Sequence, residues 1–402
     1  MLFRSQKSVA KQVPPKLANS ISYPFYLRSL VGDGSMLLNI GDSGYSNRLL
    51  SPLLLFFATH LNRSDAMQVW QDQYGRAETA PGDAWSFLFY SPDVVPQALD
   101  LPLNKRFRGS DRIFWRSGWK PGDTLFMLES GNWGPDHYHL DKHQFLLEAF
   151  GERMIVDRGM CDYSNPLSLH LHTTASHNTV TIDGQDQIAH SRQSAARLEK
   201  LVETENLRYL SSEAGAAYAD LTLFRREVLF VRSRYFILAD TLAGIRGKLA
   251  WHFHTPLHPE PMRNGLILRG ANTSLLMYIV LPQPWDWHEE LLPLDIDVQA
   301  DQLFNRLGVT AKIEPNPSRS FSDHHLTLSP VGCPEETHLL MILFPVVVDD
   351  EHRVQITETG NENENDRVIT IEHAGHRDIV DVATVWRTDL LSALRLDGAP
   401  LE

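Results

Sequence analysis

Hydrophobic positions follow two different periods along this chain, and the change falls near residue 103. From Tyr23 to about Asp93 the apolar residues recur at helical spacing, and proline, small polar residues and glycine stand where helices start and stop. This pattern predicts three amphipathic helices, over 51–60, 65–74 and 83–90. Residues 1–22 form a polar lead-in. Three helices alone would leave part of their apolar surface exposed to solvent, so we expect them to pack on the rest of the chain.

After Leu103 short apolar runs recur between glycine, aspartate and asparagine turns, and no long helical pattern is present. About 300 residues of such runs predict a large antiparallel β-sandwich rather than βαβ units. The sequence around Phe150 and Gly151 predicts a tight hairpin between two strands. The predicted fold is therefore mainly β with an N-terminal α part, divided into a helical domain over 1–103 and a sandwich over 104–402.

Composition restricts the function more than the fold. The 402 residues are 43% hydrophobic and 22% charged, as in ordinary globular proteins, and two domains are the expected number at this length. A formal net charge of −13 argues against a nucleic-acid partner, although a local cationic or metal-bearing cleft could still bind an anionic sugar. No apolar run approaches the ~20 residues of a membrane span, and the N-terminus does not resemble a signal peptide.

The two cysteines, Cys161 and Cys333, are too few for a disulfide framework. One long-range bridge is an option, but two inert buried thiols fit the composition better.

Histidines are concentrated in one part of the chain, since seven of the eighteen lie between His137 and His190. His137 and His139 would share a face if that segment were extended, while Asp157 and His177 lie at the ends of apolar alternations. Two or three imidazoles and a carboxylate are donors suited to zinc or a similar divalent ion. The alternative is that these residues are ordinary hydrogen-bonded core and turn residues. A cupin-type site fits less well, because Gln144 stands where a glutamate would be needed.

Several segments together resemble the heparinase II/III-like polysaccharide lyase family. They are R116-S-G-W119, G131-N-W-G-P-D-H-Y-H-L-D141, I155-V-D-R-G159 with Tyr163, A175-S-H-N-T-V-T-I-D-G184 and, upstream, G41-D-S-G44. The resemblance implies an (α/α) toroid followed by an antiparallel β-sandwich, and residues 1–103 would be a remnant of that toroid. It also implies export, mostly to the periplasm, for the full-length family, whereas this chain shows no export signal.

The same resemblance implies the chemistry. The family cleaves uronate-containing polysaccharides by β-elimination, His139, Asp157 and His177 match its zinc ligands, and His137 matches the histidine that faces the substrate. The zinc is expected to be structural. Asn132 and Trp133 are candidates for sugar contact, and Tyr138, where the family commonly has a small residue, would narrow the cleft or stack on sugar.

Three functions therefore remain open from the sequence. The first is a lyase acting on an acidic polysaccharide or oligosaccharide. The second is a uronate C5-epimerase, which removes the same proton without elimination. The third is a non-catalytic, zinc-stabilised sandwich that binds acidic glycan, an option favoured by the short helical part. Neither the glycan nor the oligomeric state follows from the sequence.

Overall fold

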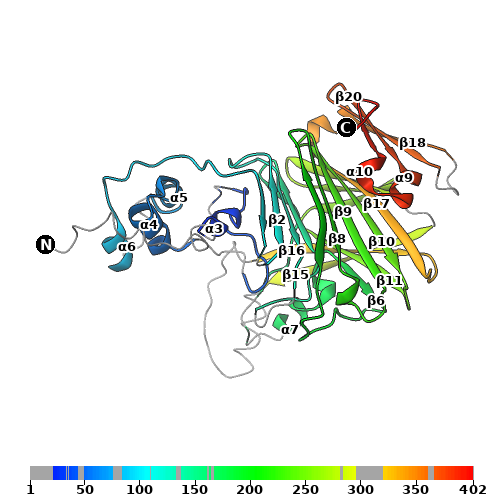
Figure 1. Cartoon of the computed structure of the whole chain (residues 1–402), viewed down its shortest axis with the longest axis horizontal. Helices are drawn as coiled ribbons and strands as arrows, with labels where there is room; N and C mark the ends of the chain where they lie inside the picture. Colours follow the sequence, from blue (N-terminus) through cyan, green and yellow to red (C-terminus); the bar gives the residue numbers. More distant parts are fainter. Residues whose placement is uncertain are drawn as a thin grey trace.

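The fold is described by a computed structural model that covers residues 21–32, 34, 36–43, 49–75, 84–108, 110–132, 137–160, 163, 167–280, 284–295, 320–360 and 366–401. Within these residues the chain begins with short helices and continues as four antiparallel sheets (Figure 1). The predicted fold class, mainly β with an N-terminal α part, is therefore confirmed. The division at residue 103 and the assignment of the helices to a toroid stay predictions.

The N-terminal helices lie close to the predicted positions. They are α3 (Tyr23–Tyr26), α4 (Ser51–His60), α5 (Ser64–Tyr74) and α6 (Ala84–Phe89). A proline occupies the first turn of α4, and α5 ends at Gly75 as expected. The apolar faces of α4 and α5 pack together around fully buried Leu54, Leu55 and Ala66. The helical part thus has a small core of its own.

The first sheet follows in the order β1–β2–β3–β4–β5, with all neighbours antiparallel. Its strands are β1 (Asn104–Phe107), β2 (Arg112–Arg116), β3 (Leu125–Glu129), β4 (Phe145–Ala149) and β5 (Glu152–Ile155). Phe150 and Gly151, both with positive φ, make the predicted hairpin between β4 and β5.

Eight strands form the central sheet, in the order β12–β13–β14–β17–β10–β9–β8–β7. Its strands are β7 (Arg197–Glu203), β8 (Leu207–Glu213), β9 (Leu223–Val231), β10 (Tyr235–Ala243), β12 (His258–Met262), β13 (Gly265–Arg269), β14 (Thr273–Val280) and β17 (Glu336–Val347). A third sheet, in the order β15–β16–β11–β6, contains β6 (Val180–Ile182), β11 (Leu249–Thr255), β15 (Trp285–Asp295) and β16 (Ser320–Pro330). One continuous core fills the space between these sheets and the first sheet, as a sandwich requires.

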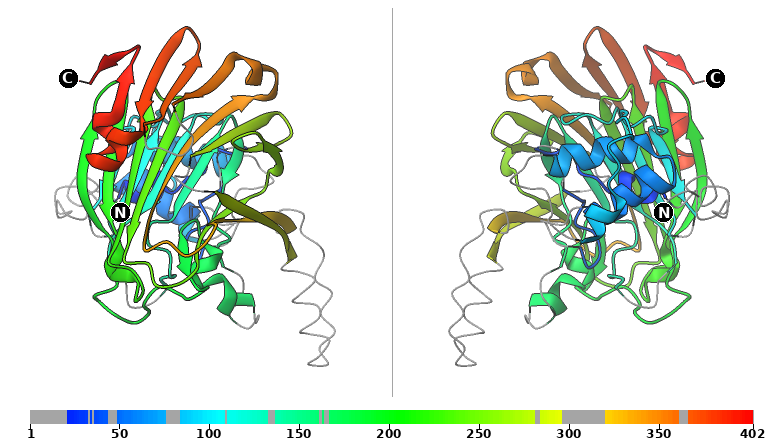
Figure 2. Two further views of the ribbon diagram at one scale, coloured as in Figure 1. Left: turned by 90° about the vertical axis from the view of Figure 1, so that its right-hand side faces the viewer. Right: turned by 90° about the vertical axis from the view of Figure 1, so that its left-hand side faces the viewer.

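The opposite face of the central sheet is covered by the C-terminal part of the chain (Figures 1 and 2). This part contains the 3₁₀ helix η4 (Val348–Arg353), β18 (Val354–Thr359), β19 (Val368–His373), β20 (His376–Asp381), α9 (Val382–Arg387), α10 (Leu390–Ala393), β21 (Leu394–Leu396) and β22 (Ala399–Pro400). A second apolar core lies under it, so the central sheet is buried on both faces.

Buried polar contacts attach the helical part to the outer face of the first sheet. The Arg116 guanidinium donates to the carbonyl oxygens of Tyr26 and Arg28, both at 2.7 Å. The Glu148 carboxylate accepts from the Ser29 hydroxyl at 2.7 Å and from the Leu30 N–H at 2.8 Å. These charge-assisted bonds fix the segment that leads to residues 39–43, which contribute to the site described below.

Two further observations concern the sequence-based expectations. Cys333 is an exposed free thiol in the turn between β16 and β17, so the expectation of a buried thiol is wrong at that position; Cys161 lies outside the described residues. In the described part of the chain, no helix has the length and apolar character needed to span a membrane.

Candidate functional site

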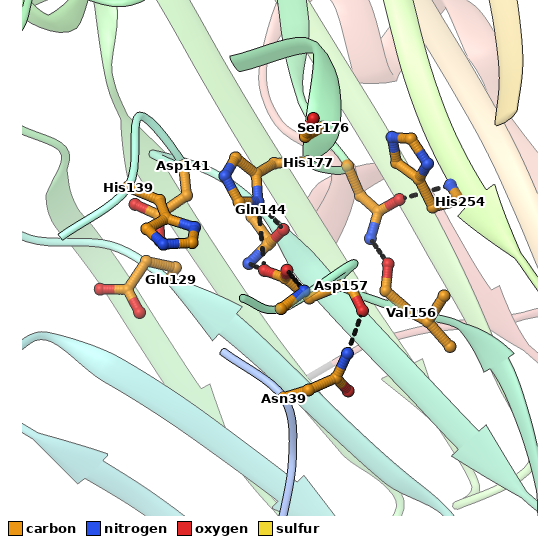
Figure 3. Close-up of polar contacts among 12 residues, drawn as sticks. Asn39, Glu129, His139, Asp141, Gln144, Val156, Asp157, Ser176, His177 and His254 are labelled. Atoms are coloured by element: carbon orange, nitrogen blue, oxygen red, sulfur yellow. Dashed lines mark hydrogen bonds and ion pairs between the residues drawn. The ribbon is translucent and has the colours of Figure 1, made fainter. Parts of the chain in front are cut away.

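Three loops of the sandwich meet at one edge of the first sheet and carry the predicted site residues. Residues 137–144 enter β4, Asp157 follows β5, and His177 precedes β6, after helix α7 (Leu167–Leu171) and the 3₁₀ helix η2 (Thr174–Ser176). Because β4 pairs with β5 and β11 links β6 into the adjacent sheet, these loops lie side by side (Figure 3). His139, Asp157 and His177 are all fully buried there.

His177 and Asp157 form a hydrogen-bonded pair with Gln144 (Figure 3). His177 Nδ1 lies 3.1 Å from Asp157 Oδ2 and 2.9 Å from Gln144 Oε1, and the Gln144 amide donates to the same carboxylate. Burial lowers the pKa of His177, but the charge and hydrogen bond of Asp157 outweigh it and leave that pKa raised. Burial conversely raises the pKa of Asp157, and His177 brings it below the ordinary value. The pair is therefore an ionic contact that orients the imidazole with Nε2 pointing elsewhere.

His139 lies next to this pair, with its ring centroid 5.1 Å from that of His177. Burial lowers the pKa of His139, and the neighbouring His177 lowers it further, so the imidazole is neutral near pH 7. Its Nε2 lies 3.1 Å from the Asp42 carboxylate and serves as the donor, which leaves the Nδ1 lone pair free.

Asp42 stands at the centre of the site, and sequence reasoning missed it. It belongs to the G41-D-S-G44 segment and is contacted by His137, His139 and Tyr163, while His172 Nε2 lies 3.4 Å from its Oδ1. Burial raises the pKa of Asp42, but the hydrogen bonds from these donors dominate and lower it below the ordinary value. The carboxylate is therefore ionised at neutral pH and links the exposed and buried parts of the site.

His137 and Tyr163 form the exposed part of the site. The His137 side chain is 67% exposed, and its Nδ1 contacts the Asp42 carboxylate and lies 2.7 Å from the Tyr163 hydroxyl. Tyr163 donates to Asp42, and this hydrogen bond raises the pKa of Tyr163 to about 12. With Nδ1 held by a carboxylate, the imidazole presents Nε2 to solvent, in the arrangement used by acid–base histidines.

The backbone of this loop differs from the extended strand expected from the sequence. His137 has φ of 62°, a left-handed conformation that interrupts strand alternation. The two histidines therefore do not share a strand face. They converge instead because both side chains reach Asp42.

Part of the cluster is arranged as a divalent metal site would require. Within the described residues, His139 Nδ1 and His177 Nε2 are buried and have no hydrogen-bond partner, and a buried imidazole nitrogen without a partner is costly unless it binds something. Asp42, His139 and His172 each offer one ligand atom within 4.8 Å of the others. The predicted trio of His139, Asp157 and His177 shares His139 with this set, but its three ligand atoms do not all lie within that distance of one another.

The remaining predicted residues lie around this cluster. Asn132 is exposed and forms an isolated β-bridge with Ala195. Tyr138 is partly buried, with the Lys142 ammonium 5.7 Å from its ring centroid. Trp133 lies outside the described residues. No contact of the described residues assigns a role to Asn132 or Tyr138.

Buried polar groups hold the site loops in place. Asn178 donates to the carbonyl oxygens of Phe145 and Val156, at 2.8 and 2.7 Å, and accepts from the His254 N–H at 2.7 Å. Arg226 is fully buried, pairs with Asp240, and donates to the carbonyl oxygens of His143 and Asn178. Arg226 therefore supports the loops that carry the site.

Gly159 shows how the upstream segment is fitted against the sandwich. It has φ of 62°, and a Cβ there would lie 2.6 Å from the Ser43 carbonyl oxygen. The next residue, Met160, donates its N–H to that oxygen at 3.2 Å. Only glycine allows this close approach, which brings Asp42 to the histidines.

A family model matches the part of the chain that carries most of the site residues. Residues 105–290 match the family model described as heparinase II/III-like, C-terminal. Heparin-sulfate lyases of Pedobacter heparinus and Bacteroides stercoris are each 26% identical to this chain, over 166 and 175 residues. Those alignments cover 40% and 42% of this chain and 24% and 25% of the relatives.

Solved structures show the same fold over most of the chain. The heparan sulfate lyase of Pedobacter heparinus superposes with a TM-score of 0.65 at 18% identity, and a heparinase III with 0.61 at 15% identity. The superpositions cover 92% of this chain in both cases, and 54% and 55% of those chains, so this chain spans about half the length of the solved relatives. The chain is therefore similar to the heparinase II/III-like polysaccharide lyases over the matched sandwich region, and it shares their fold.

Proposed function

We propose that this chain acts in β-elimination of a uronate-containing acidic glycan, with His137 as the acid–base residue and a zinc ion bound beside it. The observation that carries the proposal is the His137–Asp42–Tyr163 contact, where a solvent-facing imidazole and a phenol share one ionised carboxylate. The lyases named among the relatives support the reaction class and an acidic polysaccharide as substrate.

In this proposal Asp42 fixes the tautomer of His137. The carboxylate holds a proton on Nδ1, so in the neutral imidazole Nε2 carries the lone pair that can accept the proton from C5 of the uronate. The electron pair left at C5 forms the C4=C5 double bond as the C4–O4 bond breaks. A positioned base of this kind contributes about 10²–10⁴-fold to the rate.

Tyr163 is the proposed proton donor for the departing O4 oxygen. Its pKa of about 12 keeps the hydroxyl protonated across the neutral range, and its exposure places it within reach of a bound sugar. Proton transfer to O4 would leave a phenolate beside Asp42, and the protonated His137 would offset the charge of that phenolate.

The zinc ion is proposed to be held by His139 and His177, with Asp42 and His172 beside them. Asp157, the third ligand expected from the sequence, lies 3.1 Å from His177 Nδ1 and would orient that imidazole. The partnerless nitrogens of His139 and His177 support this assignment, since binding would satisfy both. A metal needs a deprotonated imidazole, and the raised pKa of His177 favours its protonated form, so affinity should fall in acid. When bound, the ion would fix the loops that carry His139 and His177 and would stabilise negative charge nearby. Asn132, Trp133 and Tyr138 remain proposed sugar contacts.

The experiment is incubation of the full chain with heparan sulfate, chondroitin sulfate and alginate, following the ultraviolet absorbance of unsaturated uronate ends. Activity should fall about 100-fold or more in H137A and clearly in Y163F and D42N, while H352A, which removes an exposed histidine outside the site, should match wild type. Equal activity of H137A and H352A would refute the role of His137.

A second candidate, left open by the sequence, is a non-catalytic glycan-binding sandwich. Binding of heparan sulfate without new absorbance, in protein with wild-type circular dichroism, would select it. Exchange of the C5 proton with solvent, without chain cleavage, would select the C5-epimerase.

A further inference from the structure

A second group of metal-binding side chains lies on other strands of the sandwich. His258 begins β12, Glu289 lies in β15 and His324 in β16, and each offers one ligand atom within 4.8 Å of the others. His324 Nδ1 is 2.6 Å from Glu289 Oε1. The rings of His258 and His324 have centroids 5.5 Å apart with an interplanar angle of 66°.

The strand register explains why these residues converge. His324 pairs across the ladder with Thr255 of β11, and His258 follows three residues later at the start of β12. Glu289 pairs with Leu326, two residues from His324, so the two side chains are diagonal neighbours on one face of the β15–β16 hairpin. Leu326, on that same face, is buried in the main core. Glu289 and His324 therefore lie on the face of the β15–β16 hairpin that packs on the core, at the point where that face becomes accessible to solvent.

The geometry agrees with that of a bound ion. Metal–nitrogen bonds of about 2.0–2.1 Å and a tetrahedral angle would place the centroids of two ligand rings about 5 Å apart. The observed 5.5 Å needs only a small adjustment. A hydrogen bond accounts for the Glu289–His324 pair, but it gives no reason for the exposed His258 ring to face the same point.

An ion at this position would have a structural role. β15 is an edge strand of the four-stranded sheet, and β12 is an edge strand of the eight-stranded sheet (Figure 2). An ion held by His258 on one side and by Glu289 and His324 on the other would join the edges of two sheets. Edge strands lack a partner on one side and gain from such a connection.

We propose that His258, Glu289 and His324 form a divalent metal site of the zinc type, which joins β12 to the β15–β16 hairpin. Two imidazoles and one carboxylate are a common zinc set and leave one coordination position for water. The site shares no residue with the His139 cluster, so it can be tested independently of the proposed lyase function.

The test uses the full chain without a histidine tag, stripped with a chelator and titrated with Co²⁺ and Zn²⁺ as the only added ions. Bound metal is counted by elemental analysis, and Co²⁺ binding is followed by visible absorption. H258A and H324A should each bind one ion fewer than the control H352A. Loss of a group that only orients a ligand costs about 10- to 100-fold in affinity, so loss of a ligand should cost about 100-fold or more.

Two further measurements make the result decisive. An H139A/H177A variant should still bind one ion, and adding H324A to it should abolish that binding. Zn²⁺ should raise the melting temperature more in H352A than in H258A. Because His258 is exposed, H258A should fold normally and show an unchanged circular dichroism spectrum. Equal metal content in H258A, H324A and H352A would overturn the proposal, and so would an equal Zn²⁺-dependent rise in melting temperature.

Discussion

Replacing Asp240 by asparagine should be among the most destabilising single changes in this chain. Asp240 and Arg226 are both fully buried, and their two parallel bonds measure 2.8 and 2.7 Å. Trp251 donates a third bond to the same carboxylate, at 2.9 Å. In D240N the amide nitrogen would face a donor, and the guanidinium would lose its counter-charge in the core.

Breaking a buried ion pair by removing one partner costs about 3–5 kcal/mol, and we expect D240N to lie in that range. Loss of the paired carboxylate would also loosen Arg226, which holds the carbonyl oxygens of His143 and Asn178 beside the site. Stability would be measured by urea titration, followed by far-ultraviolet circular dichroism and by tryptophan fluorescence. D350N, at an exposed pair with Arg353, is the control and should cost under about 1 kcal/mol. A loss under about 1 kcal/mol in D240N would refute the assignment of this pair as a core support.

Three other predictions follow from buried or constrained groups. G159A should destabilise the chain by at least about 1–2 kcal/mol in thermal unfolding and lower its metal content, because the new Cβ would meet the Ser43 carbonyl oxygen. The control is G375A, at a glycine that also has positive φ but has open space around it. G375A should destabilise the chain less and leave the metal content unchanged. Burial raises the pKa of Asp378, but hydrogen bonds from His373, the Asp397 N–H, Tyr235 and Arg232 outweigh it and hold this pKa at about 2. The ionised carboxylate therefore stabilises the folded chain fully above the unfolded pKa near 3.8, and this stabilisation is lost as the pH falls toward 2. Wild type should therefore lose more stability than D378N between pH 5 and pH 3, and parallel curves would contradict this. Zinc should raise the melting temperature less in H177A than in wild type, and an equal rise would argue against His177 as a ligand.

The fold could be predicted in most of its outline because it depends on local patterns. The helix over 51–60 matches α4 residue for residue, and the stop at Gly75 holds, since a proline and a glycine mark boundaries directly. The strands between Asn104 and the C-terminus were expected from short apolar runs between turns. The pairing order was not predictable, because β17 joins β10 to β14 across long stretches of sequence.

The site was predictable only where its residues lie close to strand ends. His139, Asp157 and His177 lie near one another, but their ligand atoms do not all come within 4.8 Å, and their role as metal ligands stays a prediction. Asp42 could not be found from spacing, because it is contacted by His137 across 95 residues and belongs to no strand pattern. The sequence signal for Asp42 was the glycine on either side of its segment. Gly41 has positive φ, and a Cβ there would lie 3.1 Å from the His137 carbonyl oxygen, so glycine permits this segment to approach the His137 loop. His172 belongs to no strand pattern either, and its proximity to Asp42 depends on the path of the chain after α7.

The central claim is that an imidazole oriented by Asp42 removes a proton from a uronate. The most direct measurement mixes zinc-loaded wild type, D42N and H137A with heparan sulfate and records the absorbance of unsaturated products over time. A steady rise with wild type that is lost in both variants is the predicted result. No rise with wild type on any uronate polymer, despite measured glycan binding and a bound metal, would contradict the account.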